Sequence, residues 1–161
     1  MGVSGSGKTT VGREVARRTG WPFLDADGMH SPEAVARMVA GTPLTDEDRW
    51  PWLSRISEWI AARHQAGEPG VIACSALKRR YRDRLREAHP ELRFAYLQAR
   101  PEQIADRLAR RRRHFFPTTL VDAQFADLEE PGPDEAAIVV PIGQTPDADA
   151  EAVLSALAVQ R

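Results

Sequence analysis

The sequence predicts an α/β fold, in which a parallel β-sheet is covered by α-helices on both faces. Two observations lead to this prediction. Short apolar runs alternate along the 161-residue chain with longer segments whose apolar residues recur at helical spacing. A glycine-rich segment at the start is followed at once by such a helical segment, as in a strand–loop–helix unit. No linker or repeat divides the sequence, so we expect one domain over residues 1–161.

The expected elements alternate along the whole chain. Short strands are expected at residues 22–25, 71–74, 94–97 and 137–140. Helices are expected at 8–19, from Pro32 to Gly41, from Leu53 onward, and at 78–88, 101–113 and 147–159. Residues 42–51 are expected to form a polar loop, and residues 114–133 an irregular or broken helix.

Composition excludes several classes of protein. Apolar residues make up 42% and charged residues 28% of the chain, which is an ordinary balance for a soluble domain. The net charge of -1 gives no basic field for nucleic acid, and no apolar run has the length of a membrane helix. Cys74 is the single cysteine, so an internal disulfide is excluded, and we expect a cytoplasmic protein.

The most informative motif lies at the start of the chain. Residues 2–9 read Gly-Val-Ser-Gly-Ser-Gly-Lys-Thr, the spacing of a phosphate-binding loop, or P-loop. Glycines let backbone N–H groups converge on phosphate oxygens, and the helix that follows points its positive end at the same anion. We expect ATP and Mg²⁺ as the ligands. The predicted nucleotide contacts are Gly2, Ser4, Gly5, Ser6, Gly7, Lys8, Thr9 and Thr10.

Four side chains have predicted chemical roles near this loop. Lys8 would bring a cation to the β- and γ-phosphates, and Thr9 would offer its hydroxyl to Mg²⁺. Asp25 and Asp27 follow the second expected strand, at the sheet edge where α/β proteins bind ligands. Strand alternation would point both carboxylates the same way. We assign Asp27 to the acceptor hydroxyl, as a catalytic residue, and Asp25 to the metal; the alternative is a helix-capping turn.

The chain contains no asparagine, which excludes the Asn-Lys-x-Asp motif of Ras-type GTPases. Its length fits a small-molecule or nucleotide kinase better than a motor ATPase. Further motifs then identify the sequence as similar to the gluconokinase family. They are residues 2–12 with the P-loop, 25–30 (Asp-Ala-Asp-Gly-Met-His), 41–53, 74–83 (Cys-Ser-Ala-Leu-Lys-Arg-Arg-Tyr-Arg-Asp) and 114–117 (His-Phe-Phe-Pro).

This resemblance implies a three-layer fold of the P-loop NTPase type with a lid at about residues 107–133. It implies ATP-dependent phosphorylation of D-gluconate, and a homodimer is common in that family. A carboxylate substrate needs cations, for which we choose Arg49, Lys78 and Arg82; Lys78 and Arg82 are four apart, and therefore on one helix face. His30 could donate a hydrogen bond to a substrate oxygen, or could be a structural residue.

The expected lid carries two arginines of interest. Arg107 and Arg111 are four residues apart, and Arg111 is the better candidate for a catalytic contact to the ATP phosphates on closure. Two other functions stay open. One is a kinase for another small hydroxy acid of the shikimate type, and the other is a nucleotide-binding module without turnover. Ala34, Ala123 and Pro141 depart from the family pattern, where Asn, Ser and Asp are usual.

One requirement of the P-loop is not met by this sequence. The loop should follow a buried central strand, but only Met1 precedes it. We therefore expect a sheet that lacks its first strand, and a natural chain that begins roughly ten residues upstream with a short apolar run. Without such a strand, the two neighbouring strands would expose unpaired backbone groups, and the chain would have low stability.

Overall fold

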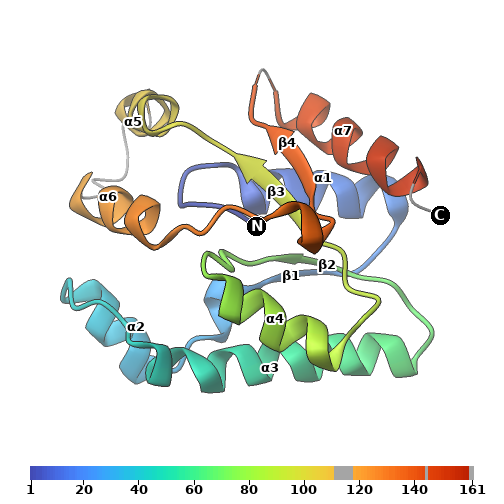
Figure 1. Cartoon of the computed structure of the whole chain (residues 1–161), viewed down its shortest axis with the longest axis horizontal. Helices are drawn as coiled ribbons and strands as arrows, with labels where there is room; N and C mark the ends of the chain where they lie inside the picture. Colours follow the sequence, from blue (N-terminus) through green and yellow to red (C-terminus); the bar gives the residue numbers. More distant parts are fainter. Residues whose placement is uncertain (111–117, 144, 160–161) are drawn as a thin grey trace.

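The structure is a computed structural model that describes residues 1–110, 118–143 and 145–159, and it confirms the alternating order of elements (Figure 1). The strands are β1 (Phe23–Asp25), β2 (Val71–Ala73), β3 (Ala95–Gln98) and β4 (Ile138–Pro141). The helices are α1 (Lys8–Thr19), α2 (Pro32–Val39), α3 (Asp46–Gln65), α4 (Arg79–Ala88), α5 (Pro101–Arg110), α6 (Thr118–Asp127) and α7 (Pro146–Val159). Two 3₁₀ turns, η1 (Ala26–Met29) and η2 (Pro133–Glu135), complete the described elements.

The strands form two separate parallel pairs, which confirms the expectation of an interrupted sheet. β1 pairs with β2, and β3 pairs with β4. Between the pairs lie the first two residues of the chain. The Met1 amine donates to the Ala95 carbonyl at 2.5 Å, and the Met1 carbonyl accepts from the Leu97 amide at 2.9 Å. The Gly2 amide donates to the Ser75 carbonyl at 3.1 Å, so residues 1–2 bridge the two pairs.

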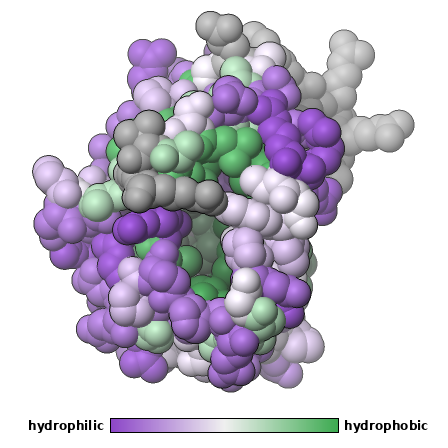
Figure 2. All heavy atoms as spheres, turned by 90° about the vertical axis from the view of Figure 1, so that its right-hand side faces the viewer, coloured by the Kyte–Doolittle hydropathy of each residue, from purple (hydrophilic) through white to green (hydrophobic). Residues whose placement is uncertain are grey.

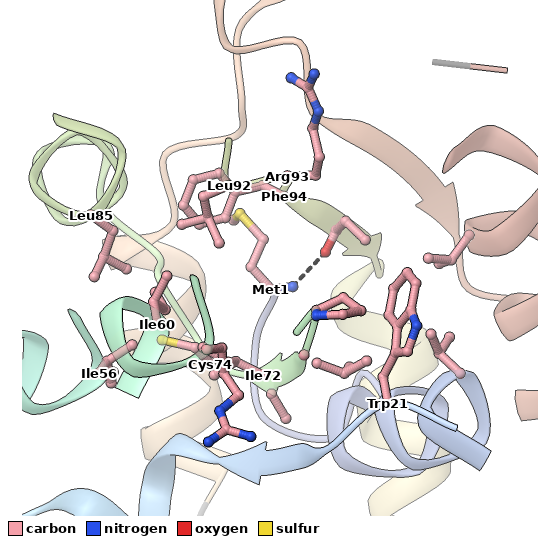
Figure 3. A pocket seen from close by; sticks show the side chains of 18 of the residues that line it. Met1, Trp21, Ile56, Ile60, Ile72, Cys74, Leu85, Leu92, Arg93 and Phe94 are labelled. Atoms are coloured by element: carbon pink, nitrogen blue, oxygen red, sulfur yellow. Dashed lines mark hydrogen bonds between the residues drawn. The ribbon is translucent and has the colours of Figure 1, made fainter. Parts of the chain in front are cut away.

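An apolar cavity of about 600 Å³ extends from Met1 between the two strand pairs. We call it the interstrand slot. Its walls include Ile72 of β2 and the neighbouring Cys74, Phe94 just before β3, and Val153 of α7. Figure 2 shows apolar atoms deep in a hollow on the side that is at the right of Figure 1. Figure 3 shows Met1 inside the slot, between Cys74 and Ile72 on one side and Leu92 and Phe94 on another.

Two apolar cores pack on the two sides of the strands, as a three-layer fold requires. One core joins α1, α5 and α7 to β3 and β4, through residues such as Val11, Ile104 and Val153. The other joins α3 and α4 to the segment after β2, through residues such as Ile56 and Leu85. Figure 1 shows α3 and α4 below β1 and β2, and α7 beside β4 and α1. The prediction of helices on both faces is therefore confirmed.

The N-terminal half of α3 corrects one expectation. Residues 42–51 were expected to be a polar loop, but α3 already begins at Asp46. Thr45 accepts a hydrogen bond from the Asp48 amide, and the Asp48 carboxylate accepts from the Thr45 amide, which makes a reciprocal capping box. Pro51 lies inside the helix and removes only one backbone hydrogen bond there. The helix therefore starts early and carries Arg49 toward the site.

In the part of the chain that the structure describes, no helix is both long enough and apolar enough to cross a bilayer.

Candidate functional site

The P-loop has the backbone shape that its glycines predict. Gly5 and Gly7 have φ values of 82° and 101°, in the left-handed region that other residues seldom adopt. The Ser6 amide donates to the Val3 carbonyl at 3.2 Å, which closes the loop, and α1 starts at Lys8 directly after it. The Ser6 side-chain oxygen is buried and has no hydrogen-bond partner among the described residues. A loop of this kind fits a phosphate group, which offers strong hydrogen-bond acceptors.

Lys8 crosses the loop from the start of α1. Its Nζ donates to the Val3 carbonyl at 2.9 Å. Burial lowers the pKa of Lys8, and the nearby carboxylate of Asp27 opposes part of that shift. A buried ammonium group gains stability from an added anion, so this residue is poised to bind a phosphate oxygen.

Thr9 and Asp25 lie together beside Lys8. The Thr9 hydroxyl donates to Asp25 Oδ2 at 2.9 Å, and Asp25 Oδ1 accepts from the Asp27 amide at 3.2 Å. No group of three or more His, Cys, Asp or Glu side chains in the described residues could hold a metal ion by itself. The pair of Thr9 and Asp25 suits Mg²⁺, which keeps water and substrate phosphates as most of its ligands.

Asp27 reaches this edge in a different way from the one expected. Strand alternation was the reason for placing it beside Asp25, but Asp27 lies in the 3₁₀ turn η1, after β1 has ended. Asp25 caps that turn, so the capping alternative is correct for Asp25, which also contacts Thr9. Asp27 itself is exposed, and its charge acts on both Lys8 and His30.

His30 stacks on a buried tryptophan. The rings of His30 and Trp52 are 4.5 Å apart and nearly parallel, and the Trp52 indole donates to the Ala26 carbonyl at 2.7 Å. Burial lowers the pKa of His30; Asp27 raises it and Arg49 lowers it. His30 therefore packs on α3 through Trp52, and the charges of Asp27 and Arg49 act on it in opposite directions.

A group of charged side chains gathers where α3 meets the start of α4. Arg49 donates to the Tyr81 hydroxyl at 2.8 Å, and Tyr81 donates to Asp46. Lys78 Nζ lies 3.4 Å from Asp46, and Arg80 pairs with the same carboxylate at 2.6 Å. Arg49 and Lys78 are thus brought together, as the sequence analysis expected of two cations for a substrate carboxylate. We call Arg49 and Lys78 the cation pair.

Helix α6 supplies two residues that the sequence analysis did not assign to the site. Asp127 lies 3.8 Å from Arg49 and 3.6 Å from Lys78. The Gln124 side-chain oxygen accepts from the Ser4 amide of the P-loop at 2.5 Å. Figure 1 shows α6 on the same side of the molecule as the loop before α1. The contacts between α6 and the P-loop join residues 120 apart in sequence, and no periodic pattern signals them.

Arg82 does not face this site. Its side chain is fully buried, and its guanidinium group forms two hydrogen bonds with Glu135, at 2.6 and 2.8 Å. It also donates to the carbonyls of Ala76 and Leu77 at 3.0 Å. The helix-face argument for Arg82 is wrong because Lys78 is the extended N-cap of α4 and lies outside the helix. Arg82 is a structural residue that holds the segment before α4 against η2.

The remaining predicted residues divide into three sets. Arg107 of α5 donates to the Ser6 carbonyl at 3.1 Å and so lies at the P-loop. Arg111 and the motif at 114–117 lie outside the described residues. Among the departures from the family pattern, Ala34 is buried, whereas Ala123 and Pro141 are exposed.

Comparisons with known proteins agree on one family. A family model described as an AAA domain matches residues 1–131. A gluconokinase of Gluconobacter oxydans is 46% identical over 91% of this chain and 83% of its own length. The thermoresistant gluconokinase of Escherichia coli is 44% identical over 87% of this chain and 80% of its own length.

Solved structures show the same relationship. A gluconokinase from Sinorhizobium meliloti superimposes with a TM-score of 0.91 and 43% identity, and covers 99% of this chain and 90% of its own. A sugar kinase from Janibacter sp. superimposes with a TM-score of 0.91 and 50% identity, over 99% of this chain and 92% of its own. An APS kinase of Mycobacterium tuberculosis is 16% identical at a TM-score of 0.64, which shows that the fold is shared.

Proposed function

The chain belongs to the gluconokinase family, and on that premise we propose that it transfers the γ-phosphoryl group of ATP to the 6-hydroxyl group of D-gluconate. The observation that supports the proposal most is the arrangement along one edge of the molecule. Helix α6 contacts both parts of this edge, because Gln124 accepts a hydrogen bond from the Ser4 amide of the P-loop and Asp127 lies 3.6 Å from Lys78 of the cation pair. That order matches a substrate with a hydroxyl group at one end and a carboxylate at the other.

The nucleotide side is built to hold anions. The P-loop amides and the N-terminus of α1 bind the phosphates, and Lys8 places its ammonium group on the phosphoryl group that is transferred. Arg107 adds a second cation at the loop. Thr9 and Asp25 would hold Mg²⁺, which neutralises phosphate charge when it is bound.

The acceptor side must orient and activate one hydroxyl group. Asp27 is exposed at the mouth of the P-loop, where it accepts the hydrogen bond of the 6-hydroxyl and then its proton. The cation pair of Arg49 and Lys78 binds the carboxylate at the other end of the acid, and His30 donates to an oxygen between them. Binding both ends fixes the hydroxyl in line with the γ-phosphate.

The setting of the reaction is part of the proposal. A lone buried Cys74, whose pKa burial raises to about 11, is an inert thiol that suits the reducing cytoplasm. We propose a homodimer as the assembly, which is the usual one in this family. The partners are then ATP and a small acid, and no nucleic acid or membrane takes part.

The experiment that tests the function is substrate-dependent release of ADP. With ATP and Mg²⁺, D-gluconate should accelerate ADP release well above the rate without an acid, other sugar acids should do so much less, and shikimate should not. Asp27→Asn should lower kcat and leave ATP binding nearly unchanged, because Asp27 acts on the acceptor. If another acid accelerates ADP release and D-gluconate does not, that acid is the substrate instead. No acceleration by any acid would favour a nucleotide-binding module.

A further inference from the structure

Two carboxylates flank the cation pair of Arg49 and Lys78, and they differ in how fully they are bonded. Asp46 is saturated. It accepts from Tyr81, lies 3.4 Å from Lys78 Nζ and pairs with Arg80 at 2.6 Å. The hydrogen bond from Tyr81 is the main reason that the pKa of Asp46 is lowered. Asp46 therefore has little capacity left for a ligand and serves to position the cations.

Asp127, in contrast, is free to accept hydrogen bonds from a ligand. Its oxygens are 3.6 Å from Lys78 and 3.8 Å from Arg49, which is too far for direct hydrogen bonds. Neither oxygen accepts a hydrogen bond from any residue in the described ranges, and the side chain is 39% exposed. An ionised carboxylate only accepts, at about four sites, so Asp127 presents free acceptor positions directly beside the two cations.

The helix that carries Asp127 is anchored at both ends of the site. Gln124, one turn earlier, binds the Ser4 amide of the P-loop. Just after Asp127, the Glu129 amide donates to the Leu77 carbonyl at 2.9 Å, next to Lys78. A side chain between two such anchors is held in a defined place relative to both the phosphate loop and Lys78.

We propose that Asp127 determines specificity by accepting a hydrogen bond from the hydroxyl group adjacent to the carboxylate of the acid. This inference rests on the proposed function, in which Arg49 and Lys78 bind that carboxylate. The charges permit it. Arg49, Lys78 and Arg80 carry three positive charges against the two negative charges of Asp46 and Asp127. A substrate carboxylate makes the group neutral, so Asp127 does not have to leave when the acid arrives.

The chemistry of the acid then decides how well it binds. A 2-hydroxy acid presents its carboxylate to the cations and its O–H to Asp127. A 2-deoxy acid leaves Asp127 desolvated and unpaired. A 2-keto acid turns a second acceptor toward a carboxylate, which is repulsive. Asp127 would thus make the site selective for 2-hydroxy acids.

The test compares kcat/KM for D-gluconate, 2-deoxy-D-gluconate and 2-keto-D-gluconate. The unmodified protein should prefer D-gluconate over the deoxy acid by about 10- to 100-fold, the usual size for a hydrogen bond to a charged group. In Asp127→Ala, kcat/KM for D-gluconate should fall to about the kcat/KM for the deoxy acid, and kcat/KM for the deoxy acid should hardly change. Asp127→Asn should improve the 2-keto acid relative to D-gluconate, because an amide N–H can donate to the ketone.

Asp122→Asn is the matched control, since Asp122 is exposed on the same helix; it should change none of the three values. If Asp127→Ala instead improves every acid, Asp127 competes with the substrate for the cations, and the inference is overturned. Equal losses for all three acids in Asp127→Ala would also overturn it. If the unmodified protein does not turn over D-gluconate at all, the proposed function fails first and the inference fails with it.

Discussion

The ligand-binding edge and the interstrand slot are two halves of the same sheet region, and they are stabilised in different ways. At the ligand edge, polar contacts hold several side chains in place: the Thr9 hydroxyl donates to Asp25, and Lys8 Nζ donates to the Val3 carbonyl. In the slot, apolar walls surround a cavity of about 600 Å³ beside Met1 (Figure 3), and backbone hydrogen bonds of Met1 and Gly2 join β3 to the segment after β2. Because the two regions are held together by different contacts, we expect changes at the ligand edge to affect catalysis and changes in the slot to affect stability.

The largest effect on stability should come from Arg82→Met. This change leaves the buried Glu135 carboxylate without its partner, which should cost about 3–5 kcal/mol of the free energy of unfolding. Urea denaturation measures the loss. The double variant Arg82→Met, Glu135→Leu should recover part of it, because no charge is then left buried. A higher KM for D-gluconate at unchanged stability would return Arg82 to the substrate site.

Lys8→Met should do the reverse and affect chemistry alone. Removing the cation nearest the transferred phosphoryl group should lower kcat on the order of 10³-fold. Stability should stay the same or rise, because a buried charge is removed. Arg84→Met, at an exposed position of α4, is the control and should change neither quantity. Unfolding of Lys8→Met at ordinary temperature would show that the P-loop and the fold are not separable.

An apolar extension ahead of Met1 should act on the slot. Four to six residues such as Val and Ile could enter as a strand between β2 and β3, where their burial should add roughly 2–3 kcal/mol to the free energy of unfolding. An extension of the same length made of Gly and Ser should add almost nothing. Thermal melts compare the two, and kcat should be the same in both. Equal melts would mean that the slot is not a strand site.

In the 161-residue chain, the Met1 amine gives a pH-dependent effect that is spread over about three pH units. Burial lowers its pKa from 8.0 to about 5. Between these values the unfolded chain binds more protons than the folded chain, so stability should rise from pH 5 to pH 8 and fall as the pH is lowered. The slope should be at most about 1.4 kcal/mol per pH unit.

The apolar extension provides the control for this effect, because it converts the amine into a peptide bond. His30, whose pKa is also lowered, contributes a slope of the same sign and is present in both chains. The difference in slope between the two chains therefore isolates the Met1 amine. Identical pH profiles would place that amine in contact with water.

Local signals predicted most of the fold and the P-loop half of the site. The P-loop spacing, the helix start at Pro32 and the apolar strand runs all act over a few residues, and each appears where expected. The early start of α3 was missed because the polar residues 42–51 were interpreted as a loop, although the Thr45–Asp48 capping box starts the helix at Asp46.

The acceptor half of the site was less predictable, because long-range contacts decide it. Arg82 and Glu135 are 53 residues apart, so the sequence could not show that Arg82 is buried in an ion pair. Asp127 meets Lys78 only after α6 has packed beside the P-loop. Periodicity places a residue on a helix face, but it does not identify the residue that faces it.

The central claim is that this edge of the molecule phosphorylates the far end of a sugar acid, and the product tests it most directly. Incubation with ATP, Mg²⁺ and uniformly ¹³C-labelled D-gluconate should give a new phosphate ester in the ³¹P NMR spectrum, coupled to carbon 6 of the acid. The ester signal should build up at the same rate as ADP, and Lys8→Met should abolish both. A phosphate ester on another carbon would contradict the orientation proposed here, and ADP formation without any ester would contradict the kinase itself.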